Sequence, residues 1–355
     1  MPHPSPQPTL AITCGDPAGI GPEVVVASWA RTPAHGAARL RVVAPLALVR
    51  DAIAFTPGLP RLAVEAVGAA DPRPSRADTV LVVEPAAAFQ PVPRGRISAA
   101  GGAAAIAALE AAFALVRAGR ADAIVTGPLN KAAIHAAGHD VPGHTEWLAR
   151  ACGLPDAAAS MMLWLPDAAG GPDGLGVVHA TLHESLREAL GRLTTADIVA
   201  AGLRLARVLP ALLGRPPRLA VAALNPHGGE GGLFGDEESR LVAPAVRALA
   251  ARGLDVAGPL PADTLFLRAS RGAFDGVVAL YHDQGHIPVK LLGMHRAVNI
   301  TLGLPVVRTS VAHGTAFDIV GNAAADPTSM LAAIDAARRL TAAPDAVTAA
   351  EASDP

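Results

Sequence analysis

The sequence predicts an α/β fold with mostly parallel sheets, in a chain long enough for two domains of ordinary size. Short runs rich in β-branched residues alternate with alanine-rich segments along the 355 residues. Strands separated by helices of this length are typical of βαβ units, in which neighbouring strands run parallel. Hydrophobic residues make up 51% of the chain but aromatic residues only 3%, so alanine, valine and leucine must form a core of closely packed helices and sheets.

The predicted strands are short apolar runs bounded by glycine, proline or polar residues. They cover residues 10–14, 40–44, 79–83, 123–126, 161–165, 176–179, 219–223, 276–280, 298–301 and 306–309. The predicted helices cover residues 22–31, 99–118, 129–137, 145–151, 195–208, 236–252 and 328–340. Pro22 fits the first turn of the first helix, and Gly253 suits the end of the helix over 236–252.

Composition and charge exclude several classes of protein. The net charge is −2 and no block of five like charges occurs, so the chain lacks the basic stripe of a nucleic-acid-binding protein. The apolar segment 99–118 is rich in alanine and glycine and carries Glu110 and Arg117, unlike a bilayer span of ~20 strongly apolar residues. Cys14 and Cys152 cannot form a disulfide framework, and the N-terminus does not read as a signal peptide. We therefore expect a cytoplasmic protein with no membrane or nucleic-acid partner.

Polar side chains gather where predicted strands end. Asp16 follows the first strand, Lys131 lies shortly after the fourth, and His227 follows the strand over 219–223. Ligands of open α/β sheets bind at the carboxyl ends of the strands. The segment Tyr-His-Asp-Gln-Gly-His-Ile-Pro-Val-Lys at 281–290 places imidazole, carboxylate, amide and ammonium groups beside an apolar strand. Because a buried charge is costly unless it is paired or ligated, these groups indicate a site that holds an anion and a metal.

A glycine-rich turn, Gly-Asp-Pro-Ala-Gly-Ile-Gly-Pro-Glu at 15–23, follows a strand and opens a helix. It begins like a dinucleotide-binding fingerprint at Gly19 and Gly21, but Val24 occupies the position of the third glycine. We therefore interpret the segment as a tight turn that lines an active cleft, with Asp16 facing the cleft. The sequence alone assigns no cofactor-binding residue.

Three histidines, His183, His227 and His282, follow three different predicted strands. Three imidazoles at strand ends can converge on one divalent ion and leave a coordination position open for substrate. Each residue taken alone is also typical of a hydrogen-bonded structural histidine. Other histidines at similar positions are rival ligands, namely His179, His286 and His313.

Two carboxylates and a set of basic and polar residues complete the candidate site. Asp263 and Asp283 can orient a ligating imidazole or transfer protons, although a helix start or an exposed surface explains each equally well. A clamp for a phosphate or carboxylate is predicted from five residues, which are His144, Thr145, Lys290, Asn299 and Arg308. Arginine supplies a forked donor and lysine a point charge. The alternative is a set of solvated residues on strand edges.

Several long segments carry a resemblance to a known family. In chain order they lie at 15–23, 126–131, 143–146, 225–232, 258–266, 281–290, 298–305, 308–310 and 313–318. Together they closely resemble the 4-hydroxythreonine-4-phosphate dehydrogenases, the PdxA family of vitamin B6 (pyridoxal phosphate) biosynthesis. The resemblance extends over roughly residues 9–340.

The resemblance implies a fold like that of the isocitrate and isopropylmalate dehydrogenases, with two α/β/α domains around an interdomain cleft and a homodimeric assembly. We expect residues 1–140 with 312–355 to form the first domain and residues 141–311 to form the second, which would carry most metal and substrate residues. Enzymes of that fold group bind NAD or NADP without the Rossmann fingerprint, in agreement with the poor match at 15–23.

The resemblance also implies the roles of single residues. The metal ligands would be His183, His227 and His282, which would hold one divalent ion (Zn, Mg, Mn or Co) per subunit. The substrate would be bound by His144, Thr145, Lys290, Asn299 and Arg308. The candidates for proton transfer are Asp263, Asp283 and Lys290. The implied reaction oxidises the C3 hydroxyl of 4-phosphooxy-L-threonine by hydride transfer to NAD or NADP, and decarboxylation then gives 3-amino-2-oxopropyl phosphate.

Departures from the family pattern leave other substrates open. Ala312 and Ala324 stand where an acidic and a basic residue are common, and Cys14 stands where methionine is usual. The segments 179–185 and 285–290 look more like sister enzymes that act on 4-phospho-D-threonate, 4-phospho-D-erythronate or the dihydrodiol formed from terephthalate.

Other segments favour a phosphorylated substrate. The intact stretches at 143–146 and 308–310 argue against the dihydrodiol, while those at 229–232 and 258–266 favour the biosynthetic substrate. A different class of protein, a metal-dependent phosphate-ester hydrolase or a non-catalytic phosphometabolite-binding protein, would explain the histidines and the basic residues equally well. It would not explain a resemblance along the whole chain.

Overall fold

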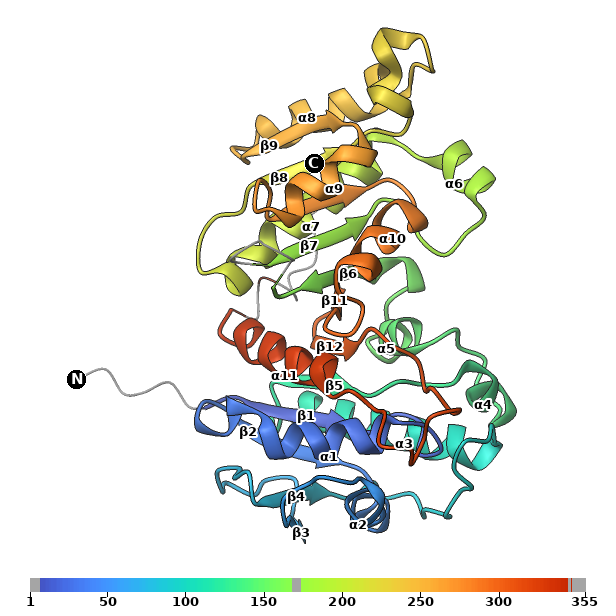
Figure 1. The fold of residues 1–355 in the computed structure, drawn as a ribbon, viewed down its shortest axis with the longest axis vertical. Coiled ribbons are helices and arrows are strands. Elements are labelled where there is room, and N and C mark those ends of the chain that lie inside the picture. Colours follow the sequence, from blue (N-terminus) through green and yellow to red (C-terminus); the bar gives the residue numbers. More distant parts are fainter. Residues whose placement is uncertain (1–6, 168–173, 344–345, 347–355) are drawn as a thin grey trace, which may run out of the picture. The chain divides into compact units, whose positions relative to one another are not determined.

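The computed structural model describes residues 7–167, 174–343 and 346. Two units divide the chain, with boundaries between 159 and 160 and between 303 and 304, and the segment that begins at Leu304 returns to the first unit (Figure 1). The predicted second domain was broader, since it began at residue 141 and ended at residue 311. The boundaries differ because β12 (Val307–Val311) pairs with β5 (Ala123–Thr126) of the first unit, and α5 (His144–Ala151) packs Leu148 into the same core.

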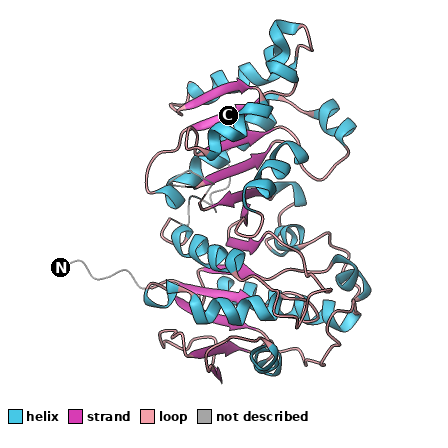
Figure 2. Ribbon diagram, in the orientation of Figure 1, coloured by secondary structure: helices cyan, strands magenta, loops and turns pink. Residues whose placement is uncertain are grey.

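The sheet of the first unit has the strand order β3-β4-β2-β1-β5-β12, and every neighbouring pair runs parallel. The other strands of this sheet are β1 (Thr9–Thr13), β2 (Arg39–Val43), β3 (Ala63–Ala66) and β4 (Thr79–Val83). The helices of the unit, with two short 3₁₀ turns, are α1 (Gly21–Arg31), η1 (Pro33–Gly36), α2 (Leu46–Phe55), α3 (Ala99–Arg117), α4 (Lys131–Ala136), α5, η2 (Asp156–Ala158) and α11 (Thr328–Leu340). Both α3 and α11 pack on β1 and β5, and they cover the sheet in an α/β/α arrangement (Figure 2).

The sheet of the second unit has the strand order β11-β6-β7-β10-β8-β9. Its strands are β6 (Ser160–Leu165), β7 (Leu175–His179), β8 (Leu219–Ala222), β9 (Val256–Leu260), β10 (Gly276–Ala279) and β11 (Val298–Leu302). Its helical segments are α6 (Leu186–Arg192), α7 (Thr195–Leu213), η3 (Pro226–Gly232), η4 (Glu238–Val242), α8 (Ala243–Ala250), α9 (Ala262–Ser270) and α10 (His282–Gly293). The four strands β7, β10, β8 and β9 run parallel, whereas β6 runs antiparallel to both of its neighbours. The prediction of an α/β fold with mostly parallel sheets is therefore confirmed.

Local signals explain where the long helices begin. The Ser98 side chain accepts a hydrogen bond from the Gly101 N–H at the start of α3. Thr194 and Asp197 form a capping box at the start of α7, and Gly214, in the left-handed conformation, ends the same helix. Each device satisfies backbone groups that a helix end leaves without intrahelical partners.

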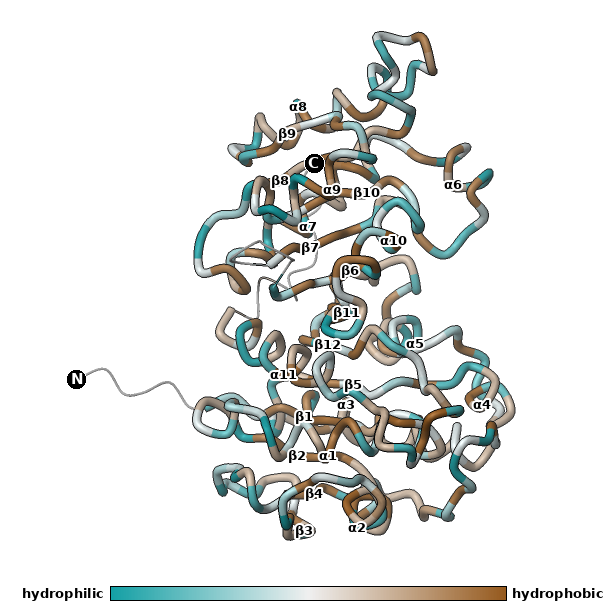
Figure 3. The backbone as a smooth tube through the Cα atoms, viewed as in Figure 1, coloured by the Kyte–Doolittle hydropathy of each residue, from teal (hydrophilic) through white to brown (hydrophobic). Residues whose placement is uncertain are grey.

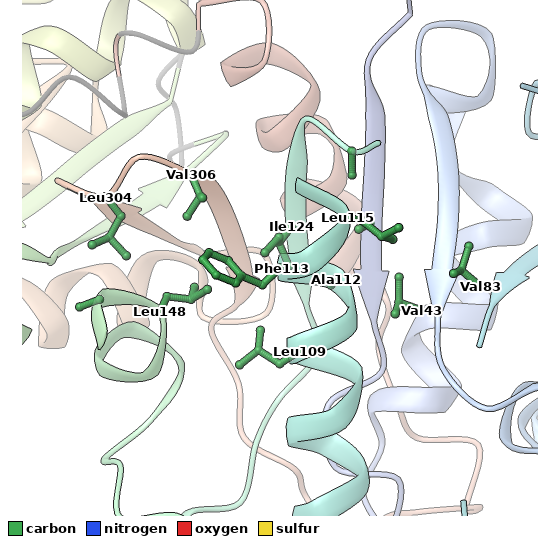
Figure 4. Packing of buried hydrophobic residues seen from close by; sticks show 13 residues of the cluster. Val43, Val83, Leu109, Ala112, Phe113, Leu115, Ile124, Leu148, Leu304 and Val306 are labelled. Carbon is green, nitrogen blue, oxygen red and sulfur yellow. The ribbon is translucent and has the colours of Figure 1, made fainter. Parts of the chain in front are cut away.

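The core of the first unit is built from small and branched side chains, as the composition predicts. Leu109, Ala112 and Phe113 of α3 pack against Ile124 of β5, and Val306 closes the cluster from the segment before β12 (Figure 4). Hydrophobic residues also follow the strands of both units in Figure 3. By length and hydropathy alone α3 would pass for a membrane span. Its buried residues pack on β1, β2 and β5, as in a core helix.

Three of the elements that the sequence analysis did not predict have weak local signals. The strands β3 and β9 lie at the two edges of their sheets, where β3 is mostly exposed and β9 contains Pro259. Proline is tolerated in edge strands because it cannot donate to a strand neighbour. The helix α10 contains Gly285 and Pro288, which normally interrupt helices. Packing against β7 and β10 overrides those local preferences.

A buried ion cluster ties β8 to β10 in the second unit. Asp275 is 2% exposed and accepts hydrogen bonds from both Arg215 and Arg218. We expect Asp275→Ala to lower the free energy of unfolding by about 2–3 kcal/mol, less than a fully buried pair because both guanidinium groups are partly exposed. Urea unfolding measures the loss. The matched control is Asp335→Ala, which removes an exposed carboxylate from a similar pair of arginines and should change stability little.

The same cluster predicts how stability depends on acid. Burial alone would raise the pKa of Asp275, but hydrogen bonds from Arg215 and Arg218 outweigh burial and hold that pKa well below its usual range. A depressed pKa contributes stability above the unfolded value of about 4, and this contribution is lost as the pH falls below it. The difference in stability between wild type and the Asp275→Ala variant should therefore shrink steadily as the pH falls below about 4. A difference that stays constant over this range would contradict the assignment.

Candidate functional site

Three neighbouring parallel strands of the second unit end at one edge of their sheet, and each is followed by one of the predicted histidines. β7 pairs with β10, and β10 pairs with β8. His183 follows β7, His282 is the first residue of α10 after β10, and His227 lies in the turn after β8. The strand order thus places the three histidines at neighbouring strand ends, with His282 in the middle.

The side chains of these histidines are not equally close to one another. The ring centroids of His183 and His282 are 6.0 Å apart. The ring of His227 lies near Phe234 instead, with centroids 6.3 Å apart. In the described part of the chain, no group of three or more His, Cys, Asp or Glu side chains is arranged to hold a metal ion. The structure brings two of the three predicted ligands together and leaves His227 in its own turn.

The turn that carries His227 is held by a buried carboxylate. Glu238 accepts hydrogen bonds from the backbone N–H groups of Leu224 (2.8 Å) and Asn225 (2.7 Å). Gly229 packs so closely that a Cβ atom there would lie 2.7 Å from Oε2 of Glu238. His227 itself has a left-handed backbone with a φ of 55°, which costs energy in any residue except glycine. These contacts fix the position of the His227 backbone at the strand end.

The start of α10 is fixed by side chains that reach the neighbouring strand ends. Gln284 accepts a hydrogen bond from the Leu280 N–H (2.7 Å) and donates one to the Ala223 carbonyl (2.7 Å). Nδ1 of His282 lies 2.5 Å from Oδ1 of Asp283. A carboxylate only accepts, so Nδ1 carries the proton and Nε2 is the ring nitrogen left for a metal ion. This is the tautomer that ligates metals, and a carboxylate is the usual second partner of such a ring.

A second pair of imidazoles lies directly behind His282. The ring of His286, one turn further along α10, stacks on the ring of His282 with centroids 3.8 Å apart and planes 10° apart. Nδ1 of His286 lies 3.1 Å from Nε2 of His179, the last residue of β7. Burial lowers the pKa of His179 to about 3 and that of His286 to about 4. Both rings are therefore neutral near pH 7.

A cavity of about 540 Å³ opens beside His183 and His282. It is lined by Leu182, His183, Glu184, Ser185, Leu186, Ala189, Tyr281, His282 and Asp283. Both carboxylates on this lining are already paired, Glu184 with Arg192 and Asp283 with His282. Neutral imidazoles suit zinc and other divalent first-row ions, and no lysine or arginine lines the cavity to repel a cation. The donor set therefore fits a divalent metal ion.

A separate polar cluster lies in the first unit, where Arg308 near the start of β12 reaches Thr126 at the carboxyl end of β5. The buried Arg308 donates from Nε and Nη2 to Oγ1 of Thr126, at 3.1 and 2.7 Å. Burial lowers the pKa of Arg308 to about 9, opposed by the charge of Glu146, so the guanidinium stays cationic at neutral pH. Burial and the nearby Arg308 together lower the pKa of His144 well below 6.5. A buried cation beside a neutral imidazole is an arrangement that an anionic group stabilises.

The other predicted site residues lie on four different helices and strands. Thr145 is the second residue of α5, Lys290 is exposed on the last turn of α10, and Asn299 lies on β11. Asp263 is exposed in the first turn of α9, as expected of a helix start. The predicted clamp is thus divided between the units, with Lys290 and Asn299 in the second and its other members in the first.

The glycine-rich turn stands at the carboxyl end of β1. Asp16 is buried, and its Oδ1 accepts a hydrogen bond from the Ala18 N–H (2.9 Å), while burial raises its pKa. The turn approaches the segment after β5 so closely that a Cβ on Gly15 would lie 2.1 Å from the Pro128 carbonyl oxygen. Burial also raises the pKa of Cys14 to about 12, so its thiol stays protonated at neutral pH.

Three contributors to these clusters were not singled out in the sequence. Thr126 and Gln284 lie at strand ends inside the segments that carry the family resemblance, and this position was a usable signal. Glu238 lies 13 residues beyond Asn225, its hydrogen-bond partner, and no spacing rule connects an acid in a helical segment with a glycine-rich turn.

The chain is similar over most of its length to proteins of one family. The model described as pyridoxal phosphate biosynthetic protein PdxA matches residues 37–337. A D-threonate 4-phosphate dehydrogenase from Cupriavidus necator is 45% identical over 328 residues, covering 92% of this chain and 95% of the relative. A 4-hydroxythreonine-4-phosphate dehydrogenase from Beijerinckia indica is 45% identical over 339 residues, covering 93% and 94%.

A solved structure agrees with these sequence matches. The crystal structure of 4-hydroxythreonine-4-phosphate dehydrogenase from Klebsiella pneumoniae has a TM-score of 0.76 and 41% identity, covering 94% of this chain and 99% of that one. The family resemblance carried by the motifs is thereby confirmed. The chain belongs to the PdxA family and is an oxidoreductase that acts on a CH–OH group.

Proposed function

We propose that this enzyme oxidises the C3 hydroxyl of a 4-phosphorylated threonine-type acid, using NAD or NADP and one divalent metal ion. The observation that carries the proposal is the pairing of His183 and His282 beside one cavity, with Asp283 holding His282 in the metal-binding tautomer. Oxidation at C3 gives a β-keto acid, which readily loses carbon dioxide.

His183 and His282 would hold the metal ion, and His227 would be the third ligand. When bound, such an ion lowers the pKa of a coordinated hydroxyl and polarises the bond that loses hydride. Asp283 is occupied with His282, so it acts on the ring and not on the substrate. Lys290 and Asp263, both exposed, are then the candidates for proton transfer.

The phosphate group would bind to residues of the first unit. Arg308 is buried and cationic, and His144 and Thr145 begin α5, where the first backbone N–H groups of a helix have no partner within the helix. Arginine and helix N-termini are both suited to phosphate, the first through forked hydrogen bonds and the second through the helix dipole. Lys290 and Asn299 are the other substrate-binding residues that the family resemblance implies.

Two substrates fit this chemistry, and they differ at C2. 4-Phosphooxy-L-threonine carries an amine there and would give 3-amino-2-oxopropyl phosphate in pyridoxal phosphate biosynthesis, as the segments 229–232 and 258–266 suggest. 4-Phospho-D-threonate carries a hydroxyl there, and the relatives named D-threonate 4-phosphate dehydrogenases support it.

Absorbance of the reduced nicotinamide band tests the proposal. Purified enzyme with a divalent metal and NAD or NADP would be given each substrate in parallel, and kcat/KM compared. A preference for the amino acid would assign the enzyme to vitamin B6 biosynthesis, and a preference for the threonate to sugar-acid catabolism. Release of inorganic phosphate without any reduced cofactor would refute the dehydrogenase proposal and support the hydrolase.

We further propose that the enzyme is a cytoplasmic homodimer that uses the exposed face of α10. Ile287, Leu291 and Met294 are 54, 82 and 44% exposed and lie at the spacing of one helix face. Apolar residues this exposed on successive turns mark an interaction site. A second copy of the chain is the occupant expected for a metabolic enzyme of this family.

Sedimentation velocity tests this surface. Wild type should sediment as a dimer and Leu291→Glu as a monomer, because a charge on the apolar face must be desolvated in the interface. The matched control is Ile97→Glu, which alters a 54% exposed residue of the first unit and should stay dimeric. A dimeric Leu291→Glu variant would rule out the α10 face.

A further inference from the structure

We propose that the buried pair of His179 and His286 positions the ring of His282 and thereby sets the metal affinity of the site. This inference rests on the metal site of the proposed function but assigns a role to two residues outside its ligand set. The pair belongs to β7 and α10, so it links two of the strand ends that carry the candidate ligands.

The contacts of the pair leave the ring of His282 little freedom. His286 covers one face of that ring at a centroid distance of 3.8 Å, and Asp283 holds its Nδ1 edge at 2.5 Å. His286 is itself held from behind, because its Nδ1 lies 3.1 Å from His179 Nε2 and 3.2 Å from the His282 carbonyl oxygen. The Nε2 edge of His282 is the one that these contacts leave for a metal.

The two imidazoles can meet because residue 285 is a glycine, where any side chain would collide with His179. A Cβ atom on Gly285 would lie 2.3 Å from Nε2 of His179 and 2.9 Å from Cγ1 of Val177. Glycine at 285 therefore lets α10 approach β7 closely enough for the two imidazoles to meet. Glycine lowers the helix propensity of α10, but it allows the close approach of α10 to β7.

Stability alone does not explain two buried imidazoles here. His179 and His286 are 6 and 7% exposed, and Nδ1 of His179 has no hydrogen-bond partner among the described residues. A buried polar atom without a partner costs free energy, so apolar residues of similar volume would serve a purely structural purpose at least as well. A positioning role accounts for the pair, since outer partners of metal-binding histidines orient the ligand ring.

The experiment measures metal affinity and stability separately. Zn²⁺ and Co²⁺ dissociation constants would be determined by competition with a chromophoric chelator, and Tm by calorimetry of the metal-free protein. We expect His286→Leu and His179→Leu to weaken metal binding about 10–100-fold while Tm stays equal or rises. His286→Asn, which keeps a polar group near the Nδ1 position, should recover part of the affinity. The matched control His295→Leu, at an exposed histidine just after α10, should change neither quantity.

A double-mutant cycle tests whether the two histidines act as a unit. If they do, the variant with both leucines binds metal no more weakly than the weaker single variant. Three results would overturn the positioning role. The first is a loss of metal affinity in the double variant that equals the sum of the two single losses, and the second is wild-type metal affinity in His286→Leu. The third is a fall in Tm that parallels the loss of metal affinity. A loss as large as that of His282→Ala would make His286 a ligand and also overturn it. If the wild type binds neither ion, the proposed metal site fails, and the inference fails with it.

Discussion

Replacing His282 with alanine is expected to lower kcat/KM by about a thousandfold or more. His282 is the middle ring of the three strand ends and the one that contacts His183, His286 and Asp283. Its loss would remove a ligand from the proposed metal site. The stabilisation that a metal gives to developing charge is worth several kcal/mol, at about 1.4 kcal/mol for each tenfold in rate. Steady-state kinetics and metal content after dialysis measure the two consequences.

Two variants calibrate this result. Asp283→Asn leaves the ring of His282 in place but weakens its orientation, so it should cost only about 10–100-fold. His227→Ala should match His282→Ala if His227 is the third ligand, and should resemble wild type if its turn stays apart from the metal. Retention of both metal and turnover by His282→Ala, with an unchanged circular dichroism spectrum, would remove His282 from the mechanism.

The second large effect is expected at Arg308, the buried cation proposed to bind the substrate phosphate. Arg308→Ala should raise KM about 30–100-fold with a smaller change in kcat, because a lost charge-assisted phosphate contact costs about 2–3 kcal/mol. The KM of Arg308→Lys should lie between those of wild type and Arg308→Ala, because lysine keeps the charge but lacks the forked guanidinium that also reaches Thr126. Kinetics with the phosphorylated substrate, together with inhibition by inorganic phosphate, measure the effect.

Inhibition by inorganic phosphate gives a second measure of the same contact. Arg308→Ala should weaken inhibition by inorganic phosphate in proportion to the rise in KM, whereas Arg96→Ala, at an exposed arginine of the same unit, should alter neither. Because Arg308 is buried, a thermal melt must show that the variant folds. A folded variant with wild-type KM and wild-type phosphate inhibition would exclude Arg308 from phosphate binding.

The sequence predicted most of the sheet, because buried parallel strands are continuous apolar runs between turn residues. It also predicted that His183, His227 and His282 stand at strand ends, since each follows such a run directly. The order of strands in the sheet could not be predicted from the sequence, because the pairing of β7 with β10 and of β10 with β8 joins segments far apart in the chain. That order, and not the spacing of the histidines, places them at neighbouring strand ends.

The side-chain contacts of the site were harder to predict than its residues. From the sequence, Asp283 could equally transfer protons, begin a helix or orient a histidine ring. Only the structure shows that its Oδ1 lies beside His282. His179 and His286 appeared only as rival ligands, since nothing in the sequence shows that Gly285 lets β7 and α10 meet. The division of the clamp also stayed hidden, because β12 returns to the first unit after the whole second unit has been completed.

The most direct test of a metal-dependent dehydrogenase is the formation of reduced cofactor by metal-stripped enzyme before and after metal is restored. The assay uses NAD and NADP with both 4-phosphooxy-L-threonine and 4-phospho-D-threonate. We expect no reduced cofactor from the stripped enzyme, and full activity with one of the substrates once about one equivalent of Zn²⁺, Co²⁺, Mn²⁺ or Mg²⁺ per chain is bound. Undiminished turnover by enzyme shown to contain no metal would contradict the account.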